Sequence, residues 1–224
     1  MVAPYLLPEL LAAAAEKLPK LYLHTTEADL AELAEGVANG TFELGIGYDL
    51  VDDPRLRRWP LFSLPPYALV SGSHRFANRE QVDLAELADE PMVLLDLPHS
   101  RDYFQSVFTA AGVTPNIRYR STTVETCRAL VGRELAYCVL NLRAAVPTAL
   151  DGHAVAVVPI SGGVPSLTVV LLDALAARPT RRARRGGRAV SQSVRERTEQ
   201  LTCVKSIFPM PYIGSMRCTD ATGR

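Results

Sequence analysis

Residues 20–48, which read KLYLHTTEADLAELAEGVANGTFELGIGY, decide the fold. The alternating segment 20–26 predicts a strand. Asp29 then precedes a helix whose apolar residues recur at three- and four-residue intervals, and Asn39-Gly40 ends that helix. Residues 42–48 are a short apolar run typical of a strand that is buried on both faces. A strand, a helix and a strand in such close succession predict a βαβ unit with two parallel strands.

The composition excludes several classes of protein. The chain has 224 residues, a formal net charge of zero and 48% hydrophobic residues, which is enough for one or two domains with real cores. A chain with no net charge is not expected to bind nucleic acid through most of its surface. No apolar run reaches the ~18 residues of a membrane span, and the N-terminus lacks the pattern of a secretion signal. We therefore predict a cytoplasmic protein without membrane contacts.

The rest of the chain continues the alternation of helices and strands. A helix is predicted from Pro8 to Leu18, and because it is apolar on nearly every side we expect it to be largely buried. Strands are predicted over residues 61–71, 92–97, 117–120, 136–140, 153–159 and 167–172, with helices after residues 100 and 121. Pro65-Pro66 interrupts the first of these strands and suggests an edge strand or a crossing between domains. The pattern predicts an α/β protein with two sets of strands and helices.

The sequence contains no pattern of an enzyme active site. GxSxG, HExxH, phosphate-loop and GxGxxG motifs are all missing. The four histidines share no metal-ligand spacing, and the four cysteines form no CxxC pair, which favours buried thiols in a reducing compartment. We predict a binding protein rather than an enzyme, with no catalytic residue, metal or cofactor.

Two helix starts are better candidates for a binding site. Pro98-His99-Ser100 and Ser121-Thr122-Thr123 each follow the carboxyl end of a predicted strand, where open α/β sheets bind ligands. Free N–H groups at a helix N-terminus suit a carboxylate or another small anion. Ordinary helix capping is the alternative, and Ser121-Thr122-Thr123 with Glu125 shortly after is close to a capping-box arrangement. A third segment of this kind, residues 25–29, favours the binding interpretation.

Four segments in a fixed order carry a family resemblance. After APYLLPELL at residues 3–11, the residues Val37, Gly40 and 43–46 follow the pattern L–x–x–G–x–x–D–L–A–I, with Glu43 in place of Asp. ALVSGSHRFA at residues 68–77 is similar to a strand followed by HPLA, and VDLAELADEPMVLLD follows it. STTVETCRALVGRELAYCVLN, residues 121–141, completes the set, with Glu134 where glycine is common. Together these segments resemble the effector-binding domain of LysR-type transcriptional regulators over residues 2–184.

The resemblance implies two Rossmann-like subdomains of the type 2 periplasmic-binding-protein fold, joined by two crossing strands. Subdomain I would comprise residues 1–67 and 155–184, without the first strand of the family, and subdomain II residues 68–154. Residues 185–224 follow a basic run, residues 178–188, and are expected to form a weakly structured tail. The winged helix-turn-helix of the family is missing, so we do not expect this chain to bind an operator by itself.

The resemblance also implies a small-molecule effector in the cleft between the subdomains and a homo-oligomer. The effector is expected to be anionic and to favour one cleft or dimer geometry. The predicted ligand contacts are Ala3, Pro4, Thr26, Ser71, His99, Ser100, Thr122, Thr123 and Asn141. Two other interpretations stay open, namely a solute-binding protein of a transport system and a truncated remnant without function.

Overall fold

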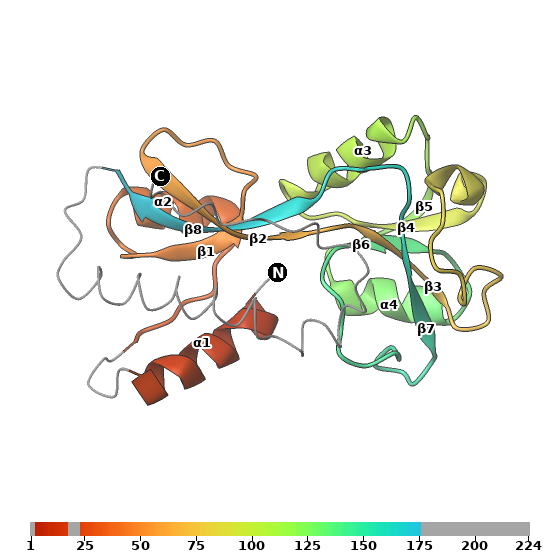
Figure 1. Cartoon of the computed structure of the whole chain (residues 1–224), viewed down its shortest axis with the longest axis horizontal. Coiled ribbons are helices and arrows are strands. Elements are labelled where there is room, and N and C mark those ends of the chain that lie inside the picture. The colour runs from red at the N-terminus through yellow and green to blue at the C-terminus, as the bar shows by residue number, and fades with distance from the viewer. Residues whose placement is uncertain (1–2, 18–22, 176–224) are drawn as a thin grey trace, which may run out of the picture.

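The computed structural model describes residues 3–17 and 23–175, which form two α/β lobes (Figure 1). The sheet of the first lobe has the strand order β1-β8-β2, and both pairings are antiparallel. Its strands are β1 (Gly45–Tyr48), β2 (Leu56–Leu64) and β8 (Leu167–Ala174). Helix α2 (Leu30–Ala38) packs on this sheet because Ala34 and Val37 join a buried cluster with strand residues.

The second lobe is a mixed sheet with helices. Strand β3 (Tyr67–Ser71) pairs antiparallel with β6 (Cys138–Leu140) and β7 (Val155–Pro159), while β4 (Pro91–Leu95) pairs parallel with β5 (Asn116–Ser121). A parallel bridge between Met92 and Tyr137 connects these two groups of strands. Helices α3 (Ser100–Ala110) and α4 (Val124–Gly132) and a short 3-10 helix, η1 (Leu84–Leu87), complete the lobe.

The chain crosses between the lobes twice, as predicted. It leaves the first sheet at the end of β2, passes Pro65-Pro66 and enters β3, and it returns through residues 160–166 into β8 (Figure 1). Leu64 and Leu167 are register partners in the β2–β8 ladder, so the two crossings lie side by side. The expected α/β class with two crossing strands is therefore confirmed.

The division of the chain into subdomains at the predicted residues stays a proposal. Strand β7 pairs with β3 in the sheet of the second lobe. This pairing favours a return to the first lobe after Pro159 rather than before Val155. The basic run 178–188 and the predicted tail 185–224 lie outside the described residues.

The predicted βαβ unit is only partly correct. Helix α2 is confirmed, and Asp29 and Glu32 form a capping box at its start. The predicted strand at residues 20–26 is wrong for its described part, since Leu23 to Thr26 are exposed and belong to no strand. Strand β1 instead pairs antiparallel with β8. Alternation of residue types is a local signal, whereas a strand also needs a distant partner.

Helix α1 (Ala3–Lys17) also differs from the prediction. It begins at Ala3, and Pro8 lies inside it rather than in its first turn. The carbonyl of Pro4 therefore receives no helical hydrogen bond, but Pro4 is exposed, so water can reach it. Within the described part of α1 only Ala13 is buried, so the expectation of a largely buried helix is wrong. No helix among the described residues is long and apolar enough to cross a membrane.

Candidate functional site

A cavity of about 240 Å³ lies between the two lobes. Its wall comes from α1 and from β1 and β8 of the first lobe, and from the ends of β4 and β6 and the first turns of α3 and α4 in the second. The lining residues are Pro4, Tyr5, Tyr48, Leu95, Leu97, Ser100, Phe104, Thr123, Val124, Glu125, Leu140, Asn141, Leu142 and Leu167. The carboxyl ends of β4 and β6 thus meet the cleft, as expected for a ligand site of an α/β sheet.

The N-terminal ends of α1, α3 and α4 all reach this cavity, through Pro4, Ser100 and Thr123. The helix starts at α3 and α4 carry no side-chain cap. The Thr123 hydroxyl donates to Thr126 Oγ1 at 2.7 Å, and the Ser121 hydroxyl donates to the Thr123 carbonyl at 3.2 Å. The capping box expected from Ser121-Thr122-Thr123 and Glu125 is therefore not formed, because the hydroxyls of Ser121 and Thr123 bond to each other's neighbours and to loop backbone groups.

An ion-pair network fixes the start of α3. Asp96, just after β4, accepts from Arg101 Nε at 2.5 Å and from Arg120 Nη1 at 3.1 Å. Chiefly the hydrogen bond from Arg101 holds the pKa of the Asp96 carboxyl below its usual value. Because Arg101 is in α3 and Arg120 is in β5, the network ties the first turn of α3 to two strands at the edge of the cavity.

The cavity is mainly apolar, with a few polar groups. Burial raises the pKa values of the Tyr48 and Tyr5 hydroxyls, which stay neutral at ordinary pH. Glu125 is the single charged residue among the described residues that line the cavity, and its carboxylate lies 3.5 Å from Arg128 Nε. Arg128 is itself buried and donates to the carbonyls of Val146 and Thr148. The charge of Glu125 is thus balanced at the wall of the cavity.

The structure brings four of the nine predicted ligand residues together. Pro4, Ser100, Thr123 and Asn141 line the cavity. Ala3 adjoins it at the start of α1, but Thr26, His99 and Thr122 are exposed and do not line it. His99 has a positive φ of 64° in the turn before α3, and its side chain does not cap that helix. The tyrosines and leucines of the wall were missed, because in sequence they look like core residues.

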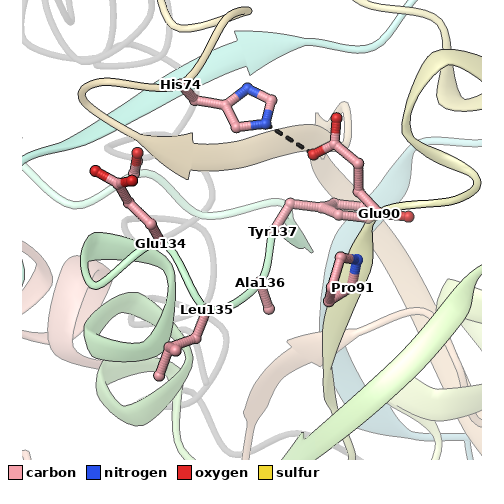
Figure 2. A pocket seen from close by; sticks show the side chains of 8 residues that line it. His74, Glu90, Pro91, Glu134, Leu135, Ala136 and Tyr137 are labelled. Carbon is pink, nitrogen blue, oxygen red and sulfur yellow. Dashed lines mark hydrogen bonds and ion pairs between the residues drawn. The ribbon is translucent and has the colours of Figure 1, made fainter.

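Ser71 belongs to a second pocket, of about 180 Å³, at another part of the second lobe (Figure 2). Its polar groups already pair with one another. His74 Nε2 lies 2.7 Å from Glu90 Oε2, Arg75 Nη2 lies 2.7 Å from Glu90 Oε1, and the Ser73 hydroxyl donates to Glu134. Among the described residues, no group of histidine, cysteine or acidic side chains could hold a metal ion. The cavity between the lobes is therefore the candidate site.

Known proteins resemble the chain in both sequence and structure. The family described as the LysR substrate binding domain matches residues 1–197. The hydrogen peroxide-inducible genes activator of Pectobacterium carotovorum subsp. carotovorum is 27% identical over 172 residues, which are 76% of this chain and 57% of that protein. The Escherichia coli K12 dual regulator OxyR is 29% identical over 147 residues, 65% of this chain and 48% of that protein. The chain thus spans about half the length of these relatives.

A solved structure agrees with this match. HinK, a LysR family transcriptional regulator from Pseudomonas aeruginosa, superimposes with a TM-score of 0.82 and 32% identity, covering 87% of this chain and 68% of that one. The likeness extends over both lobes and their crossings, and domains of this family have the type 2 periplasmic-binding-protein fold that the sequence predicts. The chain therefore belongs to the LysR substrate-binding domain family.

Proposed function

We propose that the chain is the effector-sensing part of a transcriptional regulator and that its effector is a small metabolite with an anionic group. One observation carries the proposal: the N-terminal ends of three helices meet at one cavity between two lobes. The positive potential of each helix N-terminus favours a negative charge. The N–H groups of Ser100 and Thr123 already donate to the Pro98 carbonyl and to Ser121 Oγ, and Pro4 has no N–H, so the helix dipoles rather than these groups would attract the anion. The effector contacts would be Pro4, Ser100, Thr123 and Asn141.

A ligand that touches both lobes favours the lobe arrangement that it fits best. It shifts the equilibrium between arrangements only by its difference in affinity for them. In a protein that also carries a DNA-binding domain, such a shift would change the position of that domain. We further propose that the chain forms a homodimer through helices of the two lobes. The leucines of α1 are only half-buried, so this helix offers an apolar surface for that contact.

The name of one relative, the hydrogen peroxide-inducible genes activator, refers to hydrogen peroxide, but the described residues favour reversible binding over thiol oxidation. Cys127 and Cys138 are fully buried, and neither lines the cavity. The hydrogen bond with Cys127 and burial raise the pKa of the Cys138 thiol, whereas the same hydrogen bond lowers the pKa of Cys127, so it is the burial of both thiols away from the cavity that argues against oxidation. Hydrogen peroxide therefore serves as a comparison in the binding test.

Thermal unfolding of the purified chain with a panel of small carboxylates and aromatic acids tests the proposal. A ligand at a hundred times its dissociation constant should add about 2.7 kcal/mol to the free energy of unfolding and raise the melting temperature. The variant Thr123→Glu places a negative charge at the start of α4 and should abolish the stabilisation. Thr122→Glu is the matched control, because Thr122 is exposed and lies outside the cavity lining.

The proposal fails if the chain melts cooperatively and no acid in the panel raises the melting temperature. It fails equally if the two glutamate variants respond to the acids in the same way, because the ligand would then bind elsewhere. Hydrogen peroxide that shifts the melting curve when no acid does would point to thiol chemistry instead.

A further inference from the structure

Two buried side chains of the second lobe, Asn141 and Tyr103, bind both crossings between the lobes. Asn141 directly follows β6, and its Nδ2 donates to the Leu64 carbonyl at the end of β2 at 2.8 Å. The same Nδ2 donates to the Tyr103 hydroxyl oxygen at 2.8 Å, and this hydroxyl donates its proton to the Pro165 carbonyl at 2.9 Å. Because Pro165 lies just before β8, one network of hydrogen bonds reaches the exit from the first sheet and the return to it.

The second crossing contains a hinge between two points that are held to the second lobe. The N–H of Ser161 donates to the Val82 carbonyl at 2.9 Å. Gly162 and Gly163 follow with φ values of 89° and 69°, and a Cβ built at either position would meet nothing within 4 Å. Glycine rotates about φ at little steric cost, so these two residues can turn. Beyond them, the hydrogen bond to Pro165 holds the chain to the second lobe again.

The first crossing is stiffer than the second. The rings of Pro65-Pro66 fix their φ angles. Tyr67 follows at the start of β3, and its hydroxyl donates to the Leu142 carbonyl at 2.7 Å. A change in the angle between the lobes would therefore turn the chain mainly at Gly162-Gly163, and it would carry the Pro165 carbonyl away from its donor.

We propose that Tyr103 and Asn141 form a latch that holds the two lobes at one angle, and that breaking the latch lets the second crossing turn at Gly162-Gly163. Opening would leave the hydroxyl of a buried tyrosine without its acceptor, which is unfavourable. The latch belongs to the chain without a ligand, so it goes beyond the proposed function and does not depend on the class of effector. Asn141 also lines the cavity, so the latch and the candidate site share a residue.

Double electron–electron resonance between two nitroxide labels, one on each lobe, tests the latch in the purified chain. Asp52→Cys provides the site in the first lobe, where the side chain is 91% exposed, and Leu150→Cys provides the site in the second, where the residue is 84% exposed. Cys203 and Cys218 are first replaced by serine. The two cysteines among the described residues are buried and should not react with the label.

The wild-type chain should give one narrow distribution of distances between the lobes. Tyr103→Phe releases the second crossing and should widen the distribution or add a second distance. Asn141→Leu releases the first crossing and should widen the distribution as well. Tyr137→Phe is the matched control and should keep the wild-type distribution. Tyr137 is also buried in the second lobe, but its hydroxyl has no hydrogen-bond partner among the described residues.

A second pair of labels, Thr114→Cys with Leu150→Cys, lies within the second lobe and distinguishes a latch from a general loosening. Both sites are exposed, and their distribution should be the same in all variants. A broad wild-type distribution between the lobes, or a wild-type distribution in either latch variant, would overturn the proposal. So would equal widening of both label pairs, because the network would then support the core of the second lobe. Loss of folding in either latch variant, while Tyr137→Phe folds, would overturn it for the same reason.

Discussion

At the scale of single residues, Glu134 shows how a side chain can hold an unfavourable backbone conformation. Its φ is 61°, in the left-handed region that favours glycine, and this turn ends α4 through the hydrogen bond from Glu134 N to the Val131 carbonyl. Its carboxylate accepts from the Ser73 hydroxyl after β3. The contact between α4 and the loop after β3 therefore offsets part of the backbone cost.

Replacing Glu134 separates the two effects. Glu134→Ala loses the bond to Ser73 and keeps the strained φ, whereas Glu134→Gly loses the same bond and relieves the strain. We expect the glycine variant to be more stable than the alanine variant by about 1 kcal/mol in urea denaturation.

The adjacent residue provides the control for this comparison. Arg133 has a φ of −87°, where glycine offers no relief and costs conformational entropy. Arg133→Gly should therefore be less stable than Arg133→Ala by about 0.5–1 kcal/mol. The same order of stability at both positions would contradict the role assigned to the positive φ.

At the scale of single elements, a close contact with the Phe42 ring leaves no room for a side chain at Gly36 of α2. Gly36 lies within the helix, and a Cβ built there would be 2.4 Å from the ring of Phe42. Gly36→Ala should destabilise the protein, because overpacking of about 1–3 kcal/mol outweighs a gain of about 1 kcal/mol in helix propensity.

The variant Phe42→Ala removes the ring and reverses the sign of that effect. In this background Gly36→Ala should stabilise the protein by about 1 kcal/mol, since only the propensity term remains. A double-mutant cycle in urea measures both values. An alanine effect that is the same in both backgrounds would show that the ring adapts without cost.

Elements with local signals are the ones that the sequence predicts well. The start of α2 depends on Asp29 and Glu32, which meet within one turn, and the prediction there is correct. The interior of α1 was harder to predict, because Pro8 suggests a helix start, whereas the structure has it inside the helix, four residues after the exposed residue Pro4. The segment from Leu23 to Thr26 has strand-like residues, but nothing in the sequence says whether a partner strand is available.

The residues of the candidate site also divide into those with a local sequence signal and those without one. Ser100, Thr123 and Asn141 could be found because each follows a predicted strand, and the carboxyl ends of strands collect ligands in this class of fold. Leu142 and Phe104 have no such signal, since an apolar residue at a cavity wall has the same pattern as one in the core. His99 lies in the turn before α3 with a positive φ, and its exposed side chain is not part of the cavity lining.

At the scale of the whole molecule, buried tyrosines link stability to alkaline pH. Burial raises the pKa of Tyr103 to about 12 and raises those of Tyr48, Tyr67 and Tyr137 further. A raised folded-state pKa favours the neutral phenol, so its contribution is complete below the unfolded value of about 10 and is lost as the pH rises through the folded value. We expect the chain to unfold cooperatively as the pH rises above about 10.

Absorbance of the phenolate near 295 nm and far-UV circular dichroism, recorded together from pH 9 upward, measure this transition. The buried tyrosines should ionise together with the loss of circular dichroism. In concentrated urea, all tyrosines should titrate near pH 10. Complete ionisation at that pH in a chain that keeps its circular dichroism would contradict the burial of these four side chains.

The register of β2 and β8 has a consequence for the modular organisation of the chain. Leu64 and Leu167 are opposite each other in an antiparallel ladder, so the points where the chain leaves and re-enters the first sheet are direct neighbours. In topological terms, β2 and β8 are the two arms of a hairpin, and the entire second lobe takes the place of its turn. The second lobe is thus a continuous insertion into the first, and the register of β2 and β8 brings the two ends of that insertion together.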